Sequence, residues 1–371
     1  MKEVAPKRPK YLQLVEHIRS EINAGRFEPG QALPIEASLA DSFGMARNTV
    51  RQGLARLEQE GIIHRVQGRG TFVSTPRERK ARKQLEMFAL IADQLREGFY
   101  PSLVHGFEGT CKGIQYQAIV SNSNNDVHVQ GDLVLQMIDK DVAGVALVPV
   151  TTTPTPIHQI RQLQKHHIPV VFCHRAVSGV SAPCVTWDGE QVGRMAAEAF
   201  IEQGHRRIAY LMPHRSEMSD AYIRGLRYRM LEADLELLEE NCCYYGGALP
   251  GVAAQPAIRE TLQAWSTSQN RPTAIFCGSL PDAEQVYLLA SELDWRIPED
   301  LSLAYFGGTW PNGALAERIT CVAVDEQAVG ARASELLNEM RSGKRPIDDD
   351  QKIVFPLTLM SGETLGPAPA E

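Results

Sequence analysis

The sequence has no long apolar run. No stretch approaches the roughly 18 consecutive apolar residues that a membrane-spanning helix needs. The basic N-terminus, residues 1–8, is not followed by an apolar segment of signal-peptide length. We therefore expect neither a membrane partner nor export, and the sequence predicts a cytoplasmic protein.

Metal-site and disulfide patterns are missing too. The seven cysteines form no Cys-x-x-Cys pair and have no histidine at metal-ligand spacing. Cys173, Cys277 and Cys321 lie in apolar, strand-like runs, which is typical of small core residues in a reducing compartment. We predict no metal site and no cofactor.

Catalytic motifs are absent as well. The chain has no P-loop, no Gly-x-Ser-x-Gly elbow and no His-Glu-x-x-His. The histidines are scattered, and the acidic run 348–350 is typical of a solvated loop rather than an acid/base pair. Gly68-x-Gly70 fails as a dinucleotide fingerprint, because the third glycine and the following helix are missing. The sequence therefore disfavours an enzyme and predicts no catalytic residue.

What the chain does have is a strong charge asymmetry. Its 371 residues are 43% hydrophobic and 22% charged, which is typical of globular structure and, at this length, of more than one domain. Residues 1–84 carry 16 lysines and arginines against 9 acidic residues, whereas residues 85–371 carry 22 against 36. A basic head on an acidic body indicates a polyanionic partner for the head alone.

The head is organised around a helix predicted over residues 46–60. Val50, Leu54 and Leu57 recur at i, i+4 and i+7, so one face of this helix is apolar and buried. A shorter helix beginning near Glu36 precedes it, and Gly44 supplies the turn between the two. The pattern predicts a helix-turn-helix.

Three polar residues lie off the buried face, near the N-terminal end of the longer helix: Arg47, Asn48 and Arg51. In a major groove Arg can bond guanine bidentately, Asn can bond adenine, and the positive end of the helix dipole favours phosphate. The alternative is an ordinary solvated helix face.

A hairpin is predicted after the longer helix. Two strand-like runs, 62–66 and 71–73, flank the basic, glycine-rich segment 67–70. Such a tip can approach a phosphate backbone or enter a minor groove.

The head also contains three motifs in a fixed order. They are Phe27-x-Pro29-Gly30-x-x-Leu33-Pro34-x-Glu36-x-x-Leu39-Ala40, Gly44-x-x-Arg47-x-Thr49-Val50-Arg51 and Gly68-Arg69-Gly70-Thr71-Phe72-Val73. Together they resemble the GntR winged helix. The resemblance implies double-stranded operator DNA as a partner. It also implies these DNA-binding residues: Arg47, Asn48, Thr49, Arg51, Gln67, Gly68 and Arg69.

Three positions of the head depart from the family pattern. Ile35 and Ala46 stand where the family often has serines that can cap helices, so these two helix starts are expected to be less rigid. Ala37 stands where some members have an Arg that touches DNA.

We expect three parts: a winged-helix domain over 1–75, a basic linker over 76–86 and a body over 87–371. The composition of the linker is typical of a mobile connector whose charge helps to hold DNA, or equally of a solvated linker with no role.

In the body, apolar strand-like runs alternate with helical patterns, which predicts an α/β fold with parallel sheets covered on both faces. The runs fall into two series, 87–92, 116–121, 144–149 and 170–174, then 185–187, 208–212, 274–277, 302–306 and 321–324. Two series suggest two lobes, with a ligand cleft beyond the C-terminal strand ends.

The body also carries a second set of motifs. They are Phe99-Tyr100-Pro101-Ser102-Leu103-Val104-x-Gly106-x-Glu108, Val142–Val145, Ile168–Val171, Asp188, Gly204–Ala209, Pro272–Phe276, Ile297–Ser302 and Gly330-x-x-Ala333. Over almost all of 87–362 they resemble the LacI/GalR effector-binding domain, which has the periplasmic-binding-protein fold. A GntR head on such a body looks like the arrangement of AraR-like sugar-responsive repressors.

The sequence differs from that family mainly at the positions where the family binds its ligand. An acidic residue is usual where this chain has His174, and Tyr222 replaces an Arg. Ser279-Leu280 replaces Asn-Asp, and Gly307-Gly308 replaces an Asp pair. Because carboxylates and Arg bind sugar hydroxyls through charge-assisted hydrogen bonds, the usual basis of sugar affinity is reduced. We expect an effector that is not a plain neutral sugar and that carries an anionic group or an apolar ring. The candidate effector-binding residues are Tyr100, His174, Arg175, Asp188, Tyr222, Arg224, Ser279 and Trp310.

The sequence thus predicts a DNA-binding transcriptional regulator, most simply a repressor. It would dimerise through its body and place two heads on the half-sites of a palindromic operator. A small molecule, a sugar or a sugar derivative, would control its affinity for DNA. One alternative is a body that has lost its effector and mainly dimerises. Another is a DNA-binding domain fused to an enzyme. An exported solute-binding protein would share the body fold but not the basic head.

Overall fold

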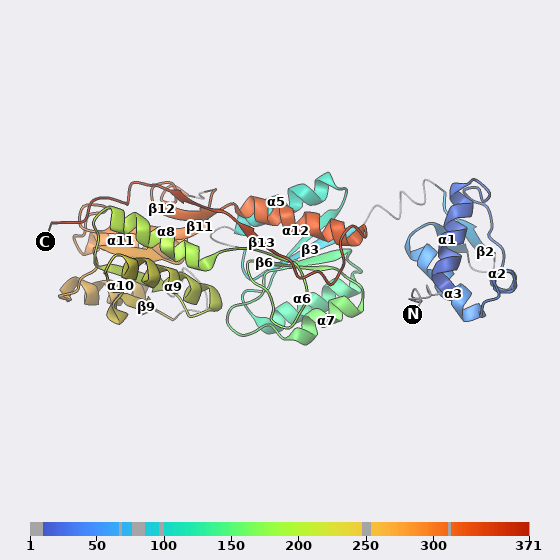
Figure 1. The fold of residues 1–371 in the computed structure, drawn as a ribbon, viewed down its shortest axis with the longest axis horizontal. Coiled ribbons are helices and arrows are strands. Elements are labelled where there is room, and N and C mark those ends of the chain that lie inside the picture. The colour runs from blue at the N-terminus through green and yellow to red at the C-terminus, as the bar shows by residue number, and fades with distance from the viewer. Residues whose placement is uncertain are drawn as a thin grey trace, which may run out of the picture. The chain divides into compact units, whose positions relative to one another are not determined.

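The computed structural model describes residues 10–66, 69–75, 86–95, 100–246, 254–310 and 313–370. The chain divides into two compact units, Met1–Glu86 and Met87–Glu371. The first unit is helical with a small hairpin, and the second is built on two sheets (Figure 1).

The first unit, the head, is a small helical domain with a two-stranded hairpin. It contains α1 (Lys10–Asn23), α2 (Glu36–Phe43), α3 (Arg47–Gln59), β1 (Ile63–Val66) and β2 (Gly70–Val73). The two strands pair antiparallel. Val50, Leu54 and Leu57 of α3 are fully buried and share one core with Leu14 and Ile18 of α1. The predicted helix-turn-helix and hairpin are confirmed.

The starts of α2 and α3 lack side-chain caps. Neither Ile35 nor Ala46 makes a capping hydrogen bond, as the sequence predicts for these two positions. Gly44 ends α2 in the left-handed conformation, with φ 56°, which a residue with a side chain adopts only at a cost.

The second unit, the body, holds two six-stranded sheets (Figure 1). The first lobe is built on the sheet ordered β13-β7-β6-β5-β3-β4, and the second on the sheet ordered β14-β12-β11-β10-β8-β9. Every neighbouring pair is parallel except β12 with β14. The first sheet consists of β3 (Met87–Ala92), β4 (Gln117–Asn122), β5 (Gly144–Leu147), β6 (Val170–Cys173), β7 (Cys184–Trp187) and β13 (Lys352–Phe355). The second consists of β8 (Ile208–Met212), β9 (Cys242–Tyr244), β10 (Ala274–Cys277), β11 (Ser302–Gly308), β12 (Thr320–Val324) and β14 (Leu357–Met360).

Helices cover both faces of each sheet. In the first lobe α5 (Tyr100–Gly113) packs with α12 (Glu326–Arg341) on one face, and α6 (Val127–Asp139) with α7 (Ile157–Lys165) on the other. In the second lobe α8 (Gly189–Glu202) packs with α9 (Glu217–Glu232), and α10 (Ala254–Thr267) with α11 (Leu280–Glu292). A short 3-10 turn, η2 (Glu239–Asn241), precedes β9. The predicted α/β architecture with parallel sheets is confirmed.

One strand, β7, lies in the first lobe, although the sequence pattern placed it in the second. β7 pairs with β6 of the first sheet, so the prediction that residues 185–187 begin the second series is wrong. No helix separates β6 from β7, and the second sheet begins only after α8. The sequence pattern showed no sign of β9, β13 or β14.

The chain crosses between the lobes three times: between β7 and α8, between β12 and α12, and between β13 and β14. At the first two crossings an aspartate caps the helix that follows. Asp188 accepts hydrogen bonds from the N–H groups of Glu190 and Gln191, and Asp325 accepts one from that of Ala328.

Two helix pairs meet at glycines. A Cβ on Gly106 of α5 would lie 1.9 Å from the carbonyl oxygen of Gln327 in α12, and a Cβ on Gly225 of α9 would lie 1.8 Å from that of Glu190 in α8. Each lobe therefore has one crossing where the backbones approach too closely for any side chain.

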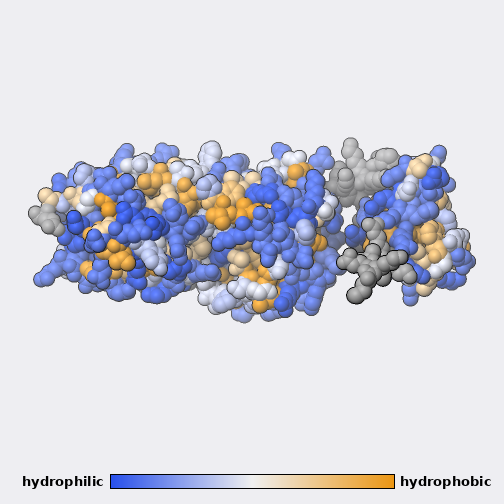
Figure 2. Space-filling model, in the orientation of Figure 1, coloured by the Kyte–Doolittle hydropathy of each residue, from blue (hydrophilic) through white to orange (hydrophobic). Residues whose placement is uncertain are grey.

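Among the described residues, no helix is both long enough and apolar enough to cross a membrane. On the face shown in Figure 2, apolar residues are scattered in small groups over a largely hydrophilic surface.

Candidate functional site

In the head, α3 presents a polar face opposite its buried one. The helix begins at Arg47, and the side chains of Arg47, Asn48 and Arg51 are exposed while Thr49 is half-buried. The first turn therefore combines free backbone N–H groups with two guanidinium groups and an amide. These are the donors that bind phosphates and base edges in a major groove.

The hairpin adds one further candidate. Arg69 is exposed, and its backbone N–H donates to the carbonyl of Val66, 2.9 Å away. Gln67 and Gly68 lie outside the described residues, so the predicted tip is only partly placed.

Glu36, the first residue of α2, contacts two arginines of this surface. Its Oε2 lies 3.2 Å from Nη2 of Arg51, and its Oε1 lies 3.6 Å from Nη2 of Arg65 in β1. One carboxylate thus bridges α3 and the hairpin. The sequence shows Glu36 only as part of a family motif and gives no sign of this role, because the contact with Arg51 spans 15 residues.

Arg51→Ala is expected to lose about 1–3 kcal/mol of specific DNA binding, whereas Arg69→Ala is expected to flatten the salt dependence of binding. The difference follows from their predicted roles, with Arg51 contacting bases from the exposed face of α3 and Arg69 contacting the phosphate backbone from the hairpin. Fluorescence anisotropy against a selected operator at several salt concentrations measures both. Unchanged operator affinity for Arg51→Ala would contradict the placement of α3 in the groove.

Glu36→Gln is expected to have opposite effects on two kinds of DNA. Removing an acid from a DNA-binding surface strengthens non-specific binding, because repulsion of phosphate falls. If the carboxylate fixes the guanidinium of Arg51, specific binding weakens at the same time by about 1 kcal/mol. Titrations against operator and scrambled duplexes separate the effects, with Glu16→Gln on α1 as the control for charge alone. A parallel gain on both duplexes would show that Glu36 has no positioning role.

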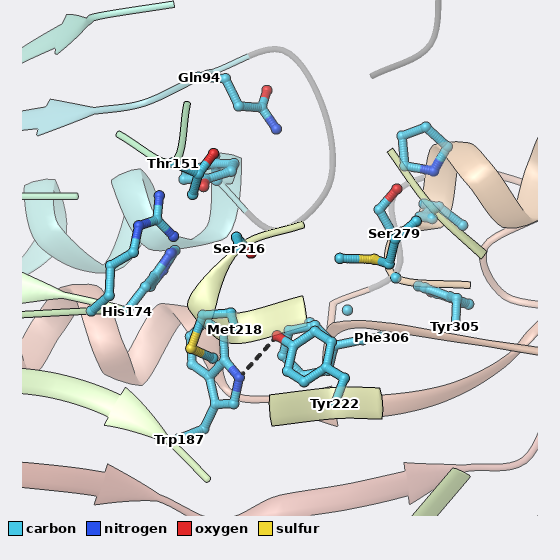
Figure 3. Close-up of a pocket in the computed structure, with 18 of the residues that line it drawn as sticks. Gln94, Thr151, His174, Trp187, Ser216, Met218, Tyr222, Ser279, Tyr305 and Phe306 are labelled. Atoms are coloured by element: carbon cyan, nitrogen blue, oxygen red, sulfur yellow. Dashed lines mark hydrogen bonds between the residues drawn. The ribbon is translucent and has the colours of Figure 1, made fainter. Parts of the chain in front are cut away.

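In the body, a cavity of about 170 Å³ lies where the carboxyl ends of the strands of both lobes face each other. Figure 3 shows side chains of both lobes pointing into it. Its lining is Gln94, Tyr100, Thr151, His174, Arg175, Trp187, Met212, His214, Ser216, Met218, Tyr222, Gly278, Ser279, Leu280, Pro281, Tyr305, Phe306, Gly307, Gly308 and Trp310.

An aromatic cluster joins the lobes on one side of the cavity. Trp187 at the end of β7 donates its Nε1–H to the hydroxyl of Tyr222 in α9, 3.2 Å away. The ring of Phe306 in β11 lies 5.1 Å from each of these two rings. Burial raises the pKa of Tyr222, so its hydroxyl stays protonated. The three rings are tilted against one another, by 35° between Trp187 and Phe306 and by 49° between Tyr222 and Phe306, and together they form an aromatic surface.

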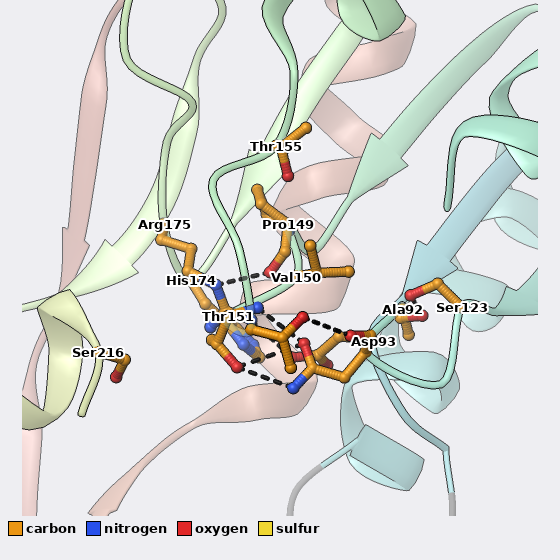
Figure 4. Close-up of polar contacts among 12 residues, drawn as sticks. Ala92, Asp93, Ser123, Pro149, Val150, Thr151, Thr155, His174, Arg175 and Ser216 are labelled. Carbon is orange, nitrogen blue, oxygen red and sulfur yellow. Dashed lines mark hydrogen bonds and ion pairs between the residues drawn. The ribbon is translucent and has the colours of Figure 1, made fainter. Parts of the chain in front are cut away.

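Another part of the lining carries a paired charge (Figure 4). The guanidinium of Arg175 lies 2.5 Å from the carboxylate of Asp93, and its Nε–H donates to the carbonyl of Pro149 at 2.6 Å. Nearby, the hydroxyl of Thr151 lies 3.0 Å from Nε2 of His214, which links the loops after β5 and β8 across the cleft. Arg175, Thr151 and His214 are thus already engaged with other polar groups of this wall, whereas Oδ1 of Asp93 is buried without a hydrogen-bond partner in the described part of the chain.

His174 forms a buried pair with Glu326, the first residue of α12. Nε2 of His174 and Oε2 of Glu326 are 3.2 Å apart, and both side chains are almost completely buried. Burial lowers the pKa of His174 to about 3 and raises that of Glu326 well above its ordinary value. The two groups therefore meet as a neutral imidazole and a protonated carboxyl. No sequence pattern pointed to Glu326 as a residue of the site.

Six of the eight predicted effector-binding residues line the cavity: Tyr100, His174, Arg175, Tyr222, Ser279 and Trp310. Asp188 and Arg224 do not. Asp188 is exposed and caps α8 at the first crossing, and the exposed Arg224 is paired with Glu190, 2.9 Å away. Both are engaged in holding α8 and α9.

The sequence did not single out Thr151, His214, Ser216 and Met218 as lining residues. The available signal was their position, just beyond the apolar runs 144–149 and 208–212, where the ligands of parallel sheets bind.

Three family models match the chain. Residues 10–73 match "Bacterial regulatory proteins, gntR family", residues 88–244 match "Periplasmic binding protein domain", and residues 197–365 match "Periplasmic binding protein-like domain". Together they cover the head and nearly all of the body.

Among curated proteins, the chain is 28% identical over 350 residues to the arabinose metabolism transcriptional repressor of Geobacillus stearothermophilus, covering 94% of this chain and 95% of that one. It is 23% identical over 370 residues to the repressor of the same name from Halalkalibacterium halodurans, covering 98% of each. Among solved structures, a complex of the transcriptional regulator CelR with cellobiose aligns with a TM-score of 0.65 at 21% identity, covering 90% of this chain and all of that one.

Proposed function

Because the chain joins a GntR-type DNA-binding domain to a periplasmic-binding-protein-like body, we propose that it represses transcription from an operator and that a small molecule in the cleft releases it. The observation that carries the first half is the exposed set Arg47, Asn48 and Arg51 on the first turn of a helix whose opposite face is buried. We assign base reading to these residues and backbone contacts to Thr49 and Arg69.

The second half rests on the cavity between the lobes. A ligand that contacts both walls favours the arrangement in which they face each other, and it can shift the protein only by its difference in affinity for the two states. The relatives are named for arabinose metabolism, and a structural neighbour is a complex with cellobiose. A sugar or a sugar derivative is therefore among the candidate effectors.

The protein would act in the cytoplasm as a homodimer, since a palindromic operator needs two heads. The spacing of its half-sites would reflect the distance between the heads. Sedimentation of the full chain with and without operator DNA tests this assembly, and a monomer bound to a single half-site would contradict it.

Selection of duplexes from a random pool, followed by footprinting, tests the function as a whole. We expect one enriched palindrome, bound at least about a thousandfold more tightly than random DNA. The selected duplex then serves to screen small molecules for release. Enrichment of no sequence would overturn the proposal, and a bound operator that no small molecule releases would favour the alternative of a body that only dimerises.

A further inference from the structure

The cavity in the body offers no uncompensated charge. Among the lining residues that the structure describes, Arg175 alone carries a permanent charge, and Asp93 neutralises it at 2.5 Å. Burial lowers the pKa of His174 to about 3, and burial also lowers that of His214, so both imidazoles are neutral near pH 7. An anionic ligand would lose its hydration without gaining a free cation.

Most of the hydroxyl groups in the lining are already bonded. Ser279 donates to Asp282, 2.9 Å away, and caps α11, while Thr151 bonds to both Asn125 and His214. A free sugar brings several hydroxyls, each of which must exchange water for a protein partner. Every one left unpaired costs about 1–3 kcal/mol. Because Ser279 and Thr151 are already engaged in these contacts, they are poorly placed to satisfy the hydroxyls of a free sugar.

Two hydroxyl groups in the lining can still donate a hydrogen bond. Tyr222 accepts from Trp187, and Ser216 accepts from the N–H of Ser219 at 3.2 Å, so the hydrogen of each remains for another acceptor. Both residues line the cavity. They suit a ligand that carries one or two oxygen acceptors.

Much of the remaining lining is aromatic or aliphatic. Trp187, Tyr222 and Phe306 form the aromatic cluster described above, and Met212, Met218, Leu280 and Pro281 add further apolar surface. Trp310, which also lines the cavity, is 63% exposed. Aromatic pairs in stacked or edge-to-face contact gain about 0.5–1.5 kcal/mol beyond area burial, and thioethers also favour aromatic edges.

Resting on the function proposed above, we propose that the effector is an uncharged compound with an aromatic ring and a carbonyl, ether or hydroxyl oxygen, rather than a free sugar or a sugar acid. The ring packs against Trp187, Tyr222 and Phe306, and the oxygen accepts from Tyr222 or Ser216. Of the two chemistries that the sequence leaves open, the paired state of Arg175 removes the anionic one. A simple aromatic amide satisfies this chemistry in full, whereas an aryl glycoside supplies the ring and an ether oxygen but keeps several sugar hydroxyls that also need partners.

Matched probes test this on the full chain by calorimetry. Benzamide and benzoate differ in charge at the same ring, and phenyl and methyl β-D-glucopyranoside differ in the ring at the same sugar. Free arabinose serves as the third arm. We expect benzamide to bind at least about tenfold more tightly than benzoate, and the phenyl glucoside at least about tenfold more tightly than the methyl one. The better of the two aromatic probes identifies the source of the ring.

Two variants on α9 provide the residue-level control. Tyr222→Phe keeps the ring but removes the hydroxyl, and should weaken the better aromatic probe about three- to tenfold. Tyr228→Phe makes the same change at an exposed position of the same helix and should leave binding unchanged. Because Tyr222→Phe also frees the Nε1–H of Trp187, Trp310→Ala, at an exposed position, supplies a second test that does not disturb the cluster. It too should weaken the probe.

Three results would overturn the ligand class: tighter binding of benzoate than of benzamide, of methyl glucoside than of phenyl glucoside, or of arabinose than of either uncharged aromatic probe. A lack of measurable binding by both benzamide and phenyl glucoside would overturn it as well. The function proposed above fails separately. A chain that binds its operator and releases it with a free sugar keeps that function while excluding the aromatic ligand, and a chain with no preferred DNA fails before any probe is added.

Discussion

Replacing Gly106 by alanine is expected to destabilise the body by about 3 kcal/mol, at the upper end of the usual cost of overpacking. The new Cβ would lie 1.9 Å from the carbonyl oxygen of Gln327 and 2.8 Å from its carbon. Both are backbone atoms of α12, so the helices must separate to make room. Their separation would also move Glu326, next to Gln327, away from His174. Urea unfolding followed by circular dichroism measures the loss.

Gly109→Ala is the matched control, because it lies one turn along the same helix. No atom lies within 4 Å of a Cβ at Gly109, which is exposed. Here alanine should stabilise the helix by about 0.5–1 kcal/mol through its lower backbone entropy in the unfolded chain. Equal effects at the two positions would mean that α5 and α12 do not cross as closely as described.

Glu326→Gln is expected to reshape the dependence of stability on pH. Burial raises the pKa of Glu326 well above 4.5 and lowers that of His174 from 6.5 to about 3. The folded pair therefore holds one proton, on Glu326. Unfolded, the same two groups hold two protons below about pH 4.5, one between about 4.5 and 6.5, and none above.

Stability rises with pH where the unfolded chain holds more protons than the folded one, and falls where it holds fewer. The pair should thus contribute no slope between about pH 4.5 and 6.5, a positive slope below that window and a negative slope above it. In the variant only His174 titrates, so its contribution rises from about pH 3 to 6.5 and is then constant. Relative to the wild type, the variant therefore gains stability as the pH rises above about 4.5, up to the raised pKa of Glu326 in the folded protein.

Chemical unfolding of both proteins between pH 5 and 8 tests this. The amide of the glutamine can still donate to Nε2 of His174, so the contact itself is retained. Glu217→Gln, which removes an exposed carboxyl at the start of α9, is the control and should leave the curve in place. Parallel curves for the wild type and Glu326→Gln would show that Glu326 is ionised in the folded protein.

The head was predictable because its determinants are local. The apolar period of α3, the glycine turn before it and the order of the motifs all lie within 64 residues of chain, and the structure places Val50, Leu54 and Leu57 in one core. The two uncapped helix starts were also visible, since a cap depends on a single residue. The bridge made by Glu36 was not visible, because it depends on how α2, α3 and β1 pack.

In the body, the sequence predicted the strands but not how they pair. Its strands were visible because a parallel strand buried on both faces is continuously apolar. Which sheet each strand joins is decided by pairing between distant residues, and β7 was assigned to the wrong lobe. In the cavity, His174 was visible as a departure from a family pattern, whereas its partner lies 152 residues further along the chain. Asp188 shows a third limit, since one carboxylate can serve a ligand or a helix end and only the fold decides.

The last two strands have a consequence for how the protein is made. β13 completes the edge of the first sheet and β14 that of the second, and both lie within residues 352–360. Neither lobe can therefore finish folding on the ribosome until residues 352–360 have emerged, although the head can fold long before. A nascent chain stalled before residue 352 would carry a finished DNA-binding domain on a body whose edge strands are the apolar β7 and β12, which are buried in the finished fold, and exposed apolar edges favour aggregation.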